Sequence, residues 1–250
     1  MSAVRGSGSS GPEASRALGR AALIAGTGLL LMTALAVFAN LFVLETLVTP
    51  GAAVRTASDI QEARGLFQVG IVAWILIAAL DVLVAWALLR FFERVNHRLS
   101  WVAAGARFTY AIVLGAAIIQ LSTALSVLSK PEETLSRISS FEDIWDAGLL
   151  LFGVHLVLVA YLAHRSGYVP KWLAALVGIA GVSYLFDSSA AVLSLDLSFK
   201  TSAVTGLGEL LLALWLVIRG RLITLDDMRP SDDSTHAERH KIDPGLVVQV

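Results

Sequence analysis

Ionisable residues interrupt long apolar stretches of this sequence, and these side chains are the ones that could do chemistry. The stretch 152–188, FGVHLVLVAYLAHRSGYVPKWLAALVGIAGVSYLFDS, holds two apolar runs joined by HRSGYVPK, with His155 in the first run and Asp187 in the second. Apolar runs of this length are typical of membrane-spanning helices. Ionisable groups inside such helices are costly to insert, so they indicate sites for protons, ions or substrates.

Counting residues along each predicted span places several polar groups at one depth. At about 1.5 Å per residue, Asp81, His155 and Glu209 lie within about 3 Å of their span midpoints. Asp187 lies about 5 Å, and Gln120 about 8 Å, toward the outside. Five spans therefore each contribute one group to a polar layer inside the membrane.

The residue types in this layer are those of proton transfer, cation binding and acid–base catalysis. The candidate catalytic residues are Asp81, His155, Asp187 and Glu209. The candidate ligand-binding residues around them are Trp74, Gln120, Tyr184 and Glu45. For Gln120 alone, as for Asn40, a helix–helix hydrogen bond worth about 0.6 kcal/mol is the simpler role.

The charges of the layer need compensation in a low dielectric. We expect at least one of Asp81, Asp187 and Glu209 to be protonated, or to pair with His155 or with a bound cation. Arg107 lies about 12 Å from its span midpoint. We therefore expect Arg107 to be too far toward the inner side to help.

The composition predicts a membrane protein and excludes several kinds of chemistry. Of the 250 residues, 56% are hydrophobic and 16% are charged, whereas soluble domains have about 25% charged residues. The absence of cysteine excludes disulfides, thiolate catalysis and cysteine metal sites. We expect no metal or other cofactor, because the one candidate pair, His236 and His240, has no third ligand. We also expect no nucleic-acid partner, because the sequence has no basic cluster.

The predicted fold class is all-α, a polytopic membrane helix bundle of six transmembrane helices. The expected spans are 21–47, 67–91, 102–128, 144–164, 172–195 and 202–218. They form one domain, 20–219, between disordered tails at 1–19 and 220–250, both of them cytoplasmic. The outer connections 58–67 and 132–144 have apolar residues at helical intervals, which fits short surface helices or ordinary loops. Trp101, Trp145 and Trp172 stand at span ends, as interfacial anchors do.

The hairpin at 152–188 resembles a known family. FGVHLVLVAYLAHRSGYVPKWL followed by IAGVSYLFDS is similar to the signature of the domain of unknown function 4386, a family of bacterial integral membrane proteins. The resemblance covers about residues 20–220, and Ala174-Ala175 departs from the Leu-Gly expected there. It places these residues on signature positions: His155, Tyr161, Arg165, Ser166, Gly167, Pro170, Tyr184, Asp187 and Glu209. The resemblance implies an integral membrane protein without an assigned activity.

Two hypotheses of different class follow for a protein of the bacterial inner membrane. The first is a protein that binds or translocates a proton, a cation or a hydrophobic or amphipathic small ligand. The second is a membrane-embedded acid–base enzyme acting on a lipid-soluble substrate, such as an isoprenoid cyclase or isomerase. The lipid bilayer is the expected environment, and assembly as a homo-oligomer would offset the small size of a transporter.

The distribution of Lys and Arg predicts that both termini are cytoplasmic. Fourteen of the 19 Lys and Arg residues lie on the side of the termini and five on the other side, and the richer side is the cytoplasmic one. A cytoplasm-active reporter fused after Gly220 should work, and one placed within 132–141 should be silent. A periplasm-active reporter that works after Gly220 would overturn the six-span topology.

Overall fold

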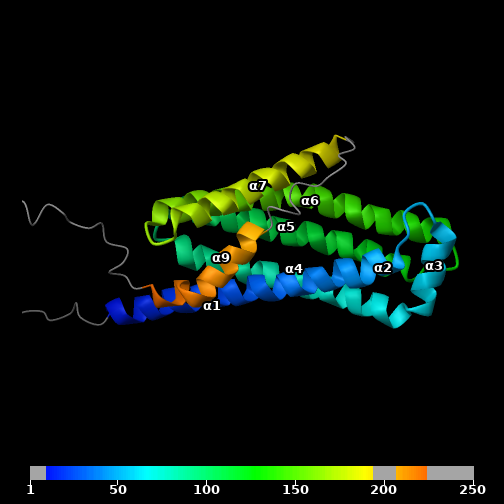
Figure 1. The fold of residues 1–250 in the computed structure, drawn as a ribbon, viewed down its shortest axis with the longest axis horizontal. Coiled ribbons are helices and arrows are strands. Elements are labelled where there is room, and N and C mark those ends of the chain that lie inside the picture. Colours follow the sequence, from blue (N-terminus) through cyan, green and yellow to red (C-terminus); the bar gives the residue numbers. More distant parts are fainter. Residues whose placement is uncertain (1–9, 194–206, 224–250) are drawn as a thin grey trace, which may run out of the picture.

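The computed structural model describes residues 10–193 and 207–223, and every element in them is helical (Figure 1). The elements are α1 (Ser10–Val37), the π-helix η1 (Phe38–Leu44), α2 (Glu45–Leu47), α3 (Ala53–Glu62), α4 (Arg64–Phe92), α5 (His97–Ala124), α6 (Pro131–Ser166), α7 (Lys171–Val192), α9 (Leu207–Ile218) and the 3₁₀ turn η2 (Gly220–Leu222). The all-α prediction is confirmed.

The long helices pack in chain order around a common centre. Helix α1 packs on α4, α4 on α5, α5 on α6, and α6 on α7. Helix α9 then lies between α7 and α1, so the first and last helices are neighbours (Figure 1). Each of the six helices therefore has a face toward the interior, where a polar layer can be shared.

Five helical segments are long and apolar enough to cross a membrane: Glu13–Leu47, Arg64–Phe92, His97–Ala124, Pro131–Ser166 and Lys171–Ala191. This is the architecture of a multi-pass integral membrane protein. They correspond to the first five predicted spans. The predicted sixth span, 202–218, is described only from Leu207, and 202–206 lie outside the described residues. The six-span count and the orientation therefore remain predictions.

The outer and N-terminal segments are more helical than we expected. Helix α1 begins at Ser10, inside the 1–19 segment for which we predicted disorder. The connection 132–144 is neither a loop nor a separate helix, because α6 runs without a break from Pro131 to Ser166. The first outer connection contains a short helix, α3, which packs against α6.

Helices α6 and α7 form a tight hairpin. Gly167 ends α6 with a φ of 75°, a conformation that glycine adopts without strain. The Tyr168 hydroxyl donates to the carbonyl of Phe91 at 3.2 Å and holds the hairpin joint against the end of α4. Burial raises the pKa of the Tyr168 phenol, so this donor keeps its proton at neutral pH.

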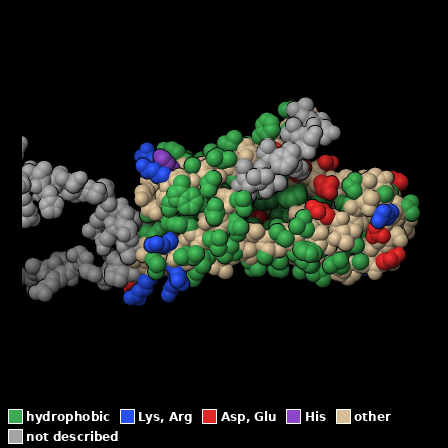
Figure 2. Space-filling model, in the orientation of Figure 1, with side chains coloured by type: hydrophobic (Ala, Val, Ile, Leu, Met, Phe, Trp, Pro, Cys, Tyr) green, Lys and Arg blue, Asp and Glu red, His purple; other side chains and the backbone are tan. Residues whose placement is uncertain are grey.

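Charged side chains separate toward the two ends of the bundle. Figure 2 shows Lys and Arg gathered at the end where α1 begins, and acidic side chains over the opposite half. The basic end holds Arg20, Arg90, Arg94 and Arg165, among others. Cytoplasmic ends of membrane proteins are enriched in Lys and Arg, so this separation supports the predicted orientation.

The hairpin generates a stability prediction, because two glycines let its helices touch. A Cβ at Gly181 would lie 2.9 Å from the Val157 nitrogen and 3.0 Å from the Gly153 oxygen, which are backbone atoms that cannot turn away. Gly181→Ala should therefore destabilise the protein by about 1–3 kcal/mol. The control is Gly178→Ala one turn earlier, whose Cβ would meet Ala160 at an ordinary 3.4 Å. Thermal unfolding in detergent distinguishes the two, and equal melting temperatures would contradict this packing.

Candidate functional site

An ion pair lies at the centre of the bundle. Arg107 Nη2 on α5 is 2.8 Å from Asp81 Oδ1 on α4, and both side chains are buried. Beyond this ion pair, no further donor reaches either carboxylate oxygen among the described residues. The guanidinium stabilises the carboxylate form of Asp81, and Asp81 keeps acceptor capacity for a further donor.

His155 on α6 holds the other side of the guanidinium. His155 Nδ1 lies 2.8 Å from the carbonyl oxygen of Ala103, which can only accept, so Nδ1 carries the proton. His155 Nε2 then accepts from Arg107 Nη1 at 3.2 Å. The imidazole is therefore the neutral tautomer and not a cation. The expectation that His155 could supply the internal positive charge is wrong, because Arg107 supplies it.

Apolar and soft groups complete the surroundings of Arg107. The guanidinium carbon lies 5.0 Å from the centre of the Phe152 ring, within the range of a cation–π contact. Arg107 Nη2 also donates to the sulfur of Met32 on α1 at 3.7 Å. Four helices, α1, α4, α5 and α6, therefore hold this one side chain.

Sequence reasoning placed Arg107 too far from the layer. The apolar run begins at 102, but α5 begins at His97, where the Asn96 side chain accepts from the Leu99 nitrogen and caps the helix. Measured from the helix midpoints, Arg107 and Asp81 each lie about 5 Å toward the inner side. The Asn96 cap was the signal that could have placed the helix start correctly.

The remaining predicted acids lie on α7 and α9. The phenol of Tyr184 lies close to the Glu209 carboxyl. Glu209 also lies within electrostatic range of Asp81 and Arg107. Asp187, 9% exposed, acts electrostatically on Tyr184. The structure therefore brings the four candidate catalytic residues, Asp81, His155, Asp187 and Glu209, into one region.

An aromatic cluster adjoins the ion pair. The Trp74 ring lies 5.1 Å from Phe141 and 5.0 Å from Trp145, with only 2% of Trp74 exposed. Trp145 Nε1 donates to the Tyr110 hydroxyl at 3.1 Å. Trp145 is half-buried against Trp74 and Phe141, and α6 extends beyond it to Pro131, so its role as an interfacial anchor remains a prediction. Trp74 serves this packing.

Two of the candidate ligand-binding residues have other surroundings. Gln120 accepts a hydrogen bond from Arg137 Nη1 at 3.2 Å and links α5 to α6. This is the helix–helix role that its residue type favours. Glu45 is exposed in α2, near the outer end of the bundle. Neither residue contacts the ion pair through an interaction that the described residues show.

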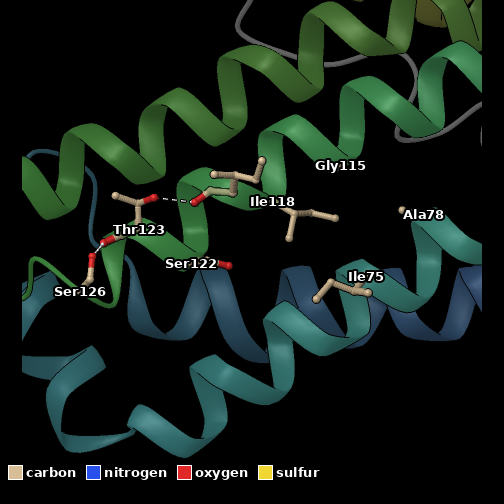
Figure 3. Close-up of a pocket in the computed structure, with 8 residues that line it drawn as sticks. Ile75, Ala78, Gly115, Ile118, Ser122, Thr123 and Ser126 are labelled. Atoms are coloured by element: carbon tan, nitrogen blue, oxygen red, sulfur yellow. Dashed lines mark hydrogen bonds between the residues drawn. The ribbon is translucent and has the colours of Figure 1, made fainter.

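A groove of about 480 Å³ lies between α4 and α5 (Figure 3). Ile75 and Ala78 of α4 face Gly115 and Ile118 of α5 across it, and hydroxyls of Ser122, Thr123 and Ser126 stand toward one end. Thr123 and Ser126 donate to backbone carbonyls, those of Ile119 and Thr123. The groove is open and mostly apolar, and no ionisable residue of the layer lines it.

Comparison with known families identifies the family of this chain. The family model "Domain of unknown function (DUF4386)" matches residues 24–220. The chain belongs to this family. The match includes the ion pair, His155, the hairpin and Glu209, so the polar layer lies within the domain.

One similar protein comes from an archaeon. An uncharacterized protein of Archaeoglobus fulgidus is 35% identical over 159 residues, which cover 62% of this chain and 85% of the relative. No solved structure matches the chain. Among residues 10–193 and 207–223, no group of three or more His, Asp or Glu residues could hold a metal ion.

The ion pair generates a mutational test. Asp81→Asn leaves Arg107 buried without its counter-charge and should cost about 3–5 kcal/mol of stability. Adding Arg107→Met removes the uncompensated charge, so the double variant should melt at a higher temperature than Asp81→Asn alone. The measurement is a thermal melt of each detergent-purified variant. If the two losses simply add, the side chains do not pair.

Proposed function

We propose that this chain is an integral membrane protein that binds a proton or a cationic small ligand in its intramembrane polar layer. The supporting observation is a charge imbalance. Arg107 is the single Lys or Arg side chain in the layer among the described residues, and Asp81 already takes its charge at 2.8 Å. Glu209 faces a neutral phenol, that of Tyr184. If Glu209 is ionised in these surroundings, a further positive charge is needed to balance its carboxylate.

The surroundings of Glu209 favour this role. A carboxylate in a low dielectric is stabilised by a proton or a cation, and Arg107 is held by other groups. The neighbouring phenol of Tyr184 can donate to the carboxylate or offer an aromatic edge to an amphipathic ligand. Asp81 keeps acceptor capacity beyond its pair with Arg107, which adds an acceptor beside the site.

A hollow in the surface of the bundle suggests a route to the layer. Figure 2 shows this hollow with acidic side chains near it. Acidic groups at an opening attract cations from solution.

The enzyme hypothesis has less support than the binding hypothesis. A general acid must carry a proton that it can donate. The ion pair with Arg107 favours the carboxylate form of Asp81, and the tautomer of His155 is fixed by Ala103 and Arg107. The acid would then have to be Glu209 or Asp187. We therefore propose binding as the function.

The test compares Glu209→Gln with Glu132→Gln, which removes an exposed acid at the outer end of α6. The probes are Na⁺, K⁺ and tetraphenylphosphonium, added to detergent-purified protein while its melting temperature is measured. At least one probe should stabilise the unmodified protein and the Glu132→Gln control. Glu209→Gln should bind it at least about thirtyfold more weakly, because one partner of a buried charge pair is gone. Stabilisation should be weaker at pH 5 than at pH 8, since protons compete for the carboxylate.

The proton alternative has its own readout. If no cation binds, infrared spectroscopy at pH 7 should show a protonated-carboxyl band that is absent in Glu209→Gln and retained in Glu132→Gln. Unchanged binding in Glu209→Gln would refute the assignment. The same holds if no probe binds and no such band is present.

A further inference from the structure

A second cavity lies far from the polar layer, at the basic end of the bundle. It has a volume of about 300 Å³ and is formed between the first part of α1 and the last part of α4. Three arginines line it, Arg20 from α1 and Arg90 and Arg94 from the end of α4. One acidic residue, Glu93, also lines it, so the charged lining has a net charge of +2.

The arginines are available to a ligand. Arg90 forms one ion pair, with Glu93 at 3.4 Å, and its side chain is still 55% exposed. Exposed pairs of this kind contribute little to stability and exchange easily. Arg20 and Arg94 are exposed and form no ion pair with another described residue. Planar guanidinium groups bind phosphate in a bidentate manner, so the lining suits a phosphate group.

The other end of the cavity is apolar. Leu18, Ala21 and Ile24 of α1 face Trp86 of α4 across it. Trp86 is 48% exposed, and the Arg90 guanidinium lies 5.9 Å from the centre of its ring. From Trp86 to Arg90 the lining extends about 6 Å along α4, and Arg94 lies in the turn just after this helix. The cavity therefore passes from arginines at the helix ends to apolar side chains deeper in the bundle.

We propose that this cavity binds an anionic phospholipid of the surrounding leaflet. The three arginines bind the headgroup phosphate, and Trp86 with the apolar face of α1 holds the first part of an acyl chain. Free phosphate would match the arginines but leave the apolar half without a partner. Basic pockets between helices on the cytoplasmic side are suited to anionic headgroups. Bound there, the lipid joins α1 to α4 at their charged ends, independently of the ligand of the polar layer.

The test uses the full chain in a neutral detergent. Dioleoylphosphatidylglycerol should raise its melting temperature and remain bound in native mass spectrometry, whereas dioleoylphosphatidylcholine should do neither. The double variant Arg20→Gln with Arg94→Gln should bind the anionic lipid about 25-fold more weakly, since each arginine near an anionic lipid contributes about fivefold. The matched control, Arg165→Gln with Lys171→Gln, removes two positive charges from the same end of the bundle but outside the cavity.

Three outcomes would overturn the proposal. The first is equal binding of both lipids. The second is an equal loss of binding in the cavity variant and in the control, which would indicate a diffuse attraction to the basic end. The third is stabilisation by inorganic phosphate as large as that by the lipid, which would make the site one for soluble phosphate.

Discussion

An ion pair joins a guanidinium and a carboxylate at the centre of an apolar helix bundle, and the surrounding helices must compensate the burial of both charges. Removing two charges from water costs several kcal/mol for each ion, and only close pairing with further contacts offsets that cost. Arg107 meets Asp81 on one side, the neutral nitrogen of His155 on another and the Phe152 ring on a third. These contacts come from α4 and α6, and Met32 of α1 adds another, so the position of Arg107 depends on how three helices pack around α5.

Small residues lie where other helices of the bundle meet. Gly153 and Gly181 let α6 and α7 approach until their backbones touch, and Gly208 does the same for α9 against Leu176. The hydrogen bond between Trp145 and Tyr110 and the packing of Trp74 fill the space on the outer side of the pair. Packing and electrostatics therefore support each other at one level of the bundle.

The sequence predicted that Asp81 is buried, but it did not predict its partner. Trp74 and Asp81 share one helix face by their spacing, and both side chains are buried in the structure. The depths that helical rise assigns to Asp81 and Glu209 remain predictions. The position of Arg107 was not predicted, because a helix can begin before its apolar run begins. In addition, the long side chain of Arg107 reaches across several ångströms. The sequence also could not show that α9 packs beside α1, since contacts between the chain's first and last helices have no local signal. Whether the acids bind a ligand is a question that neither spacing nor burial answers alone.

The order of the helices has a consequence for biosynthesis. Asp81 and Arg107 lie on α4 and α5, which are consecutive in the chain and packed against each other. The two charges can thus neutralise one another as a hairpin when the nascent chain enters the bilayer, before the later helices exist. Glu209, in contrast, comes much later in the chain, on α9, which packs against both α7 and α1. The acid that we propose for ligand binding is therefore the final part of the centre to be assembled.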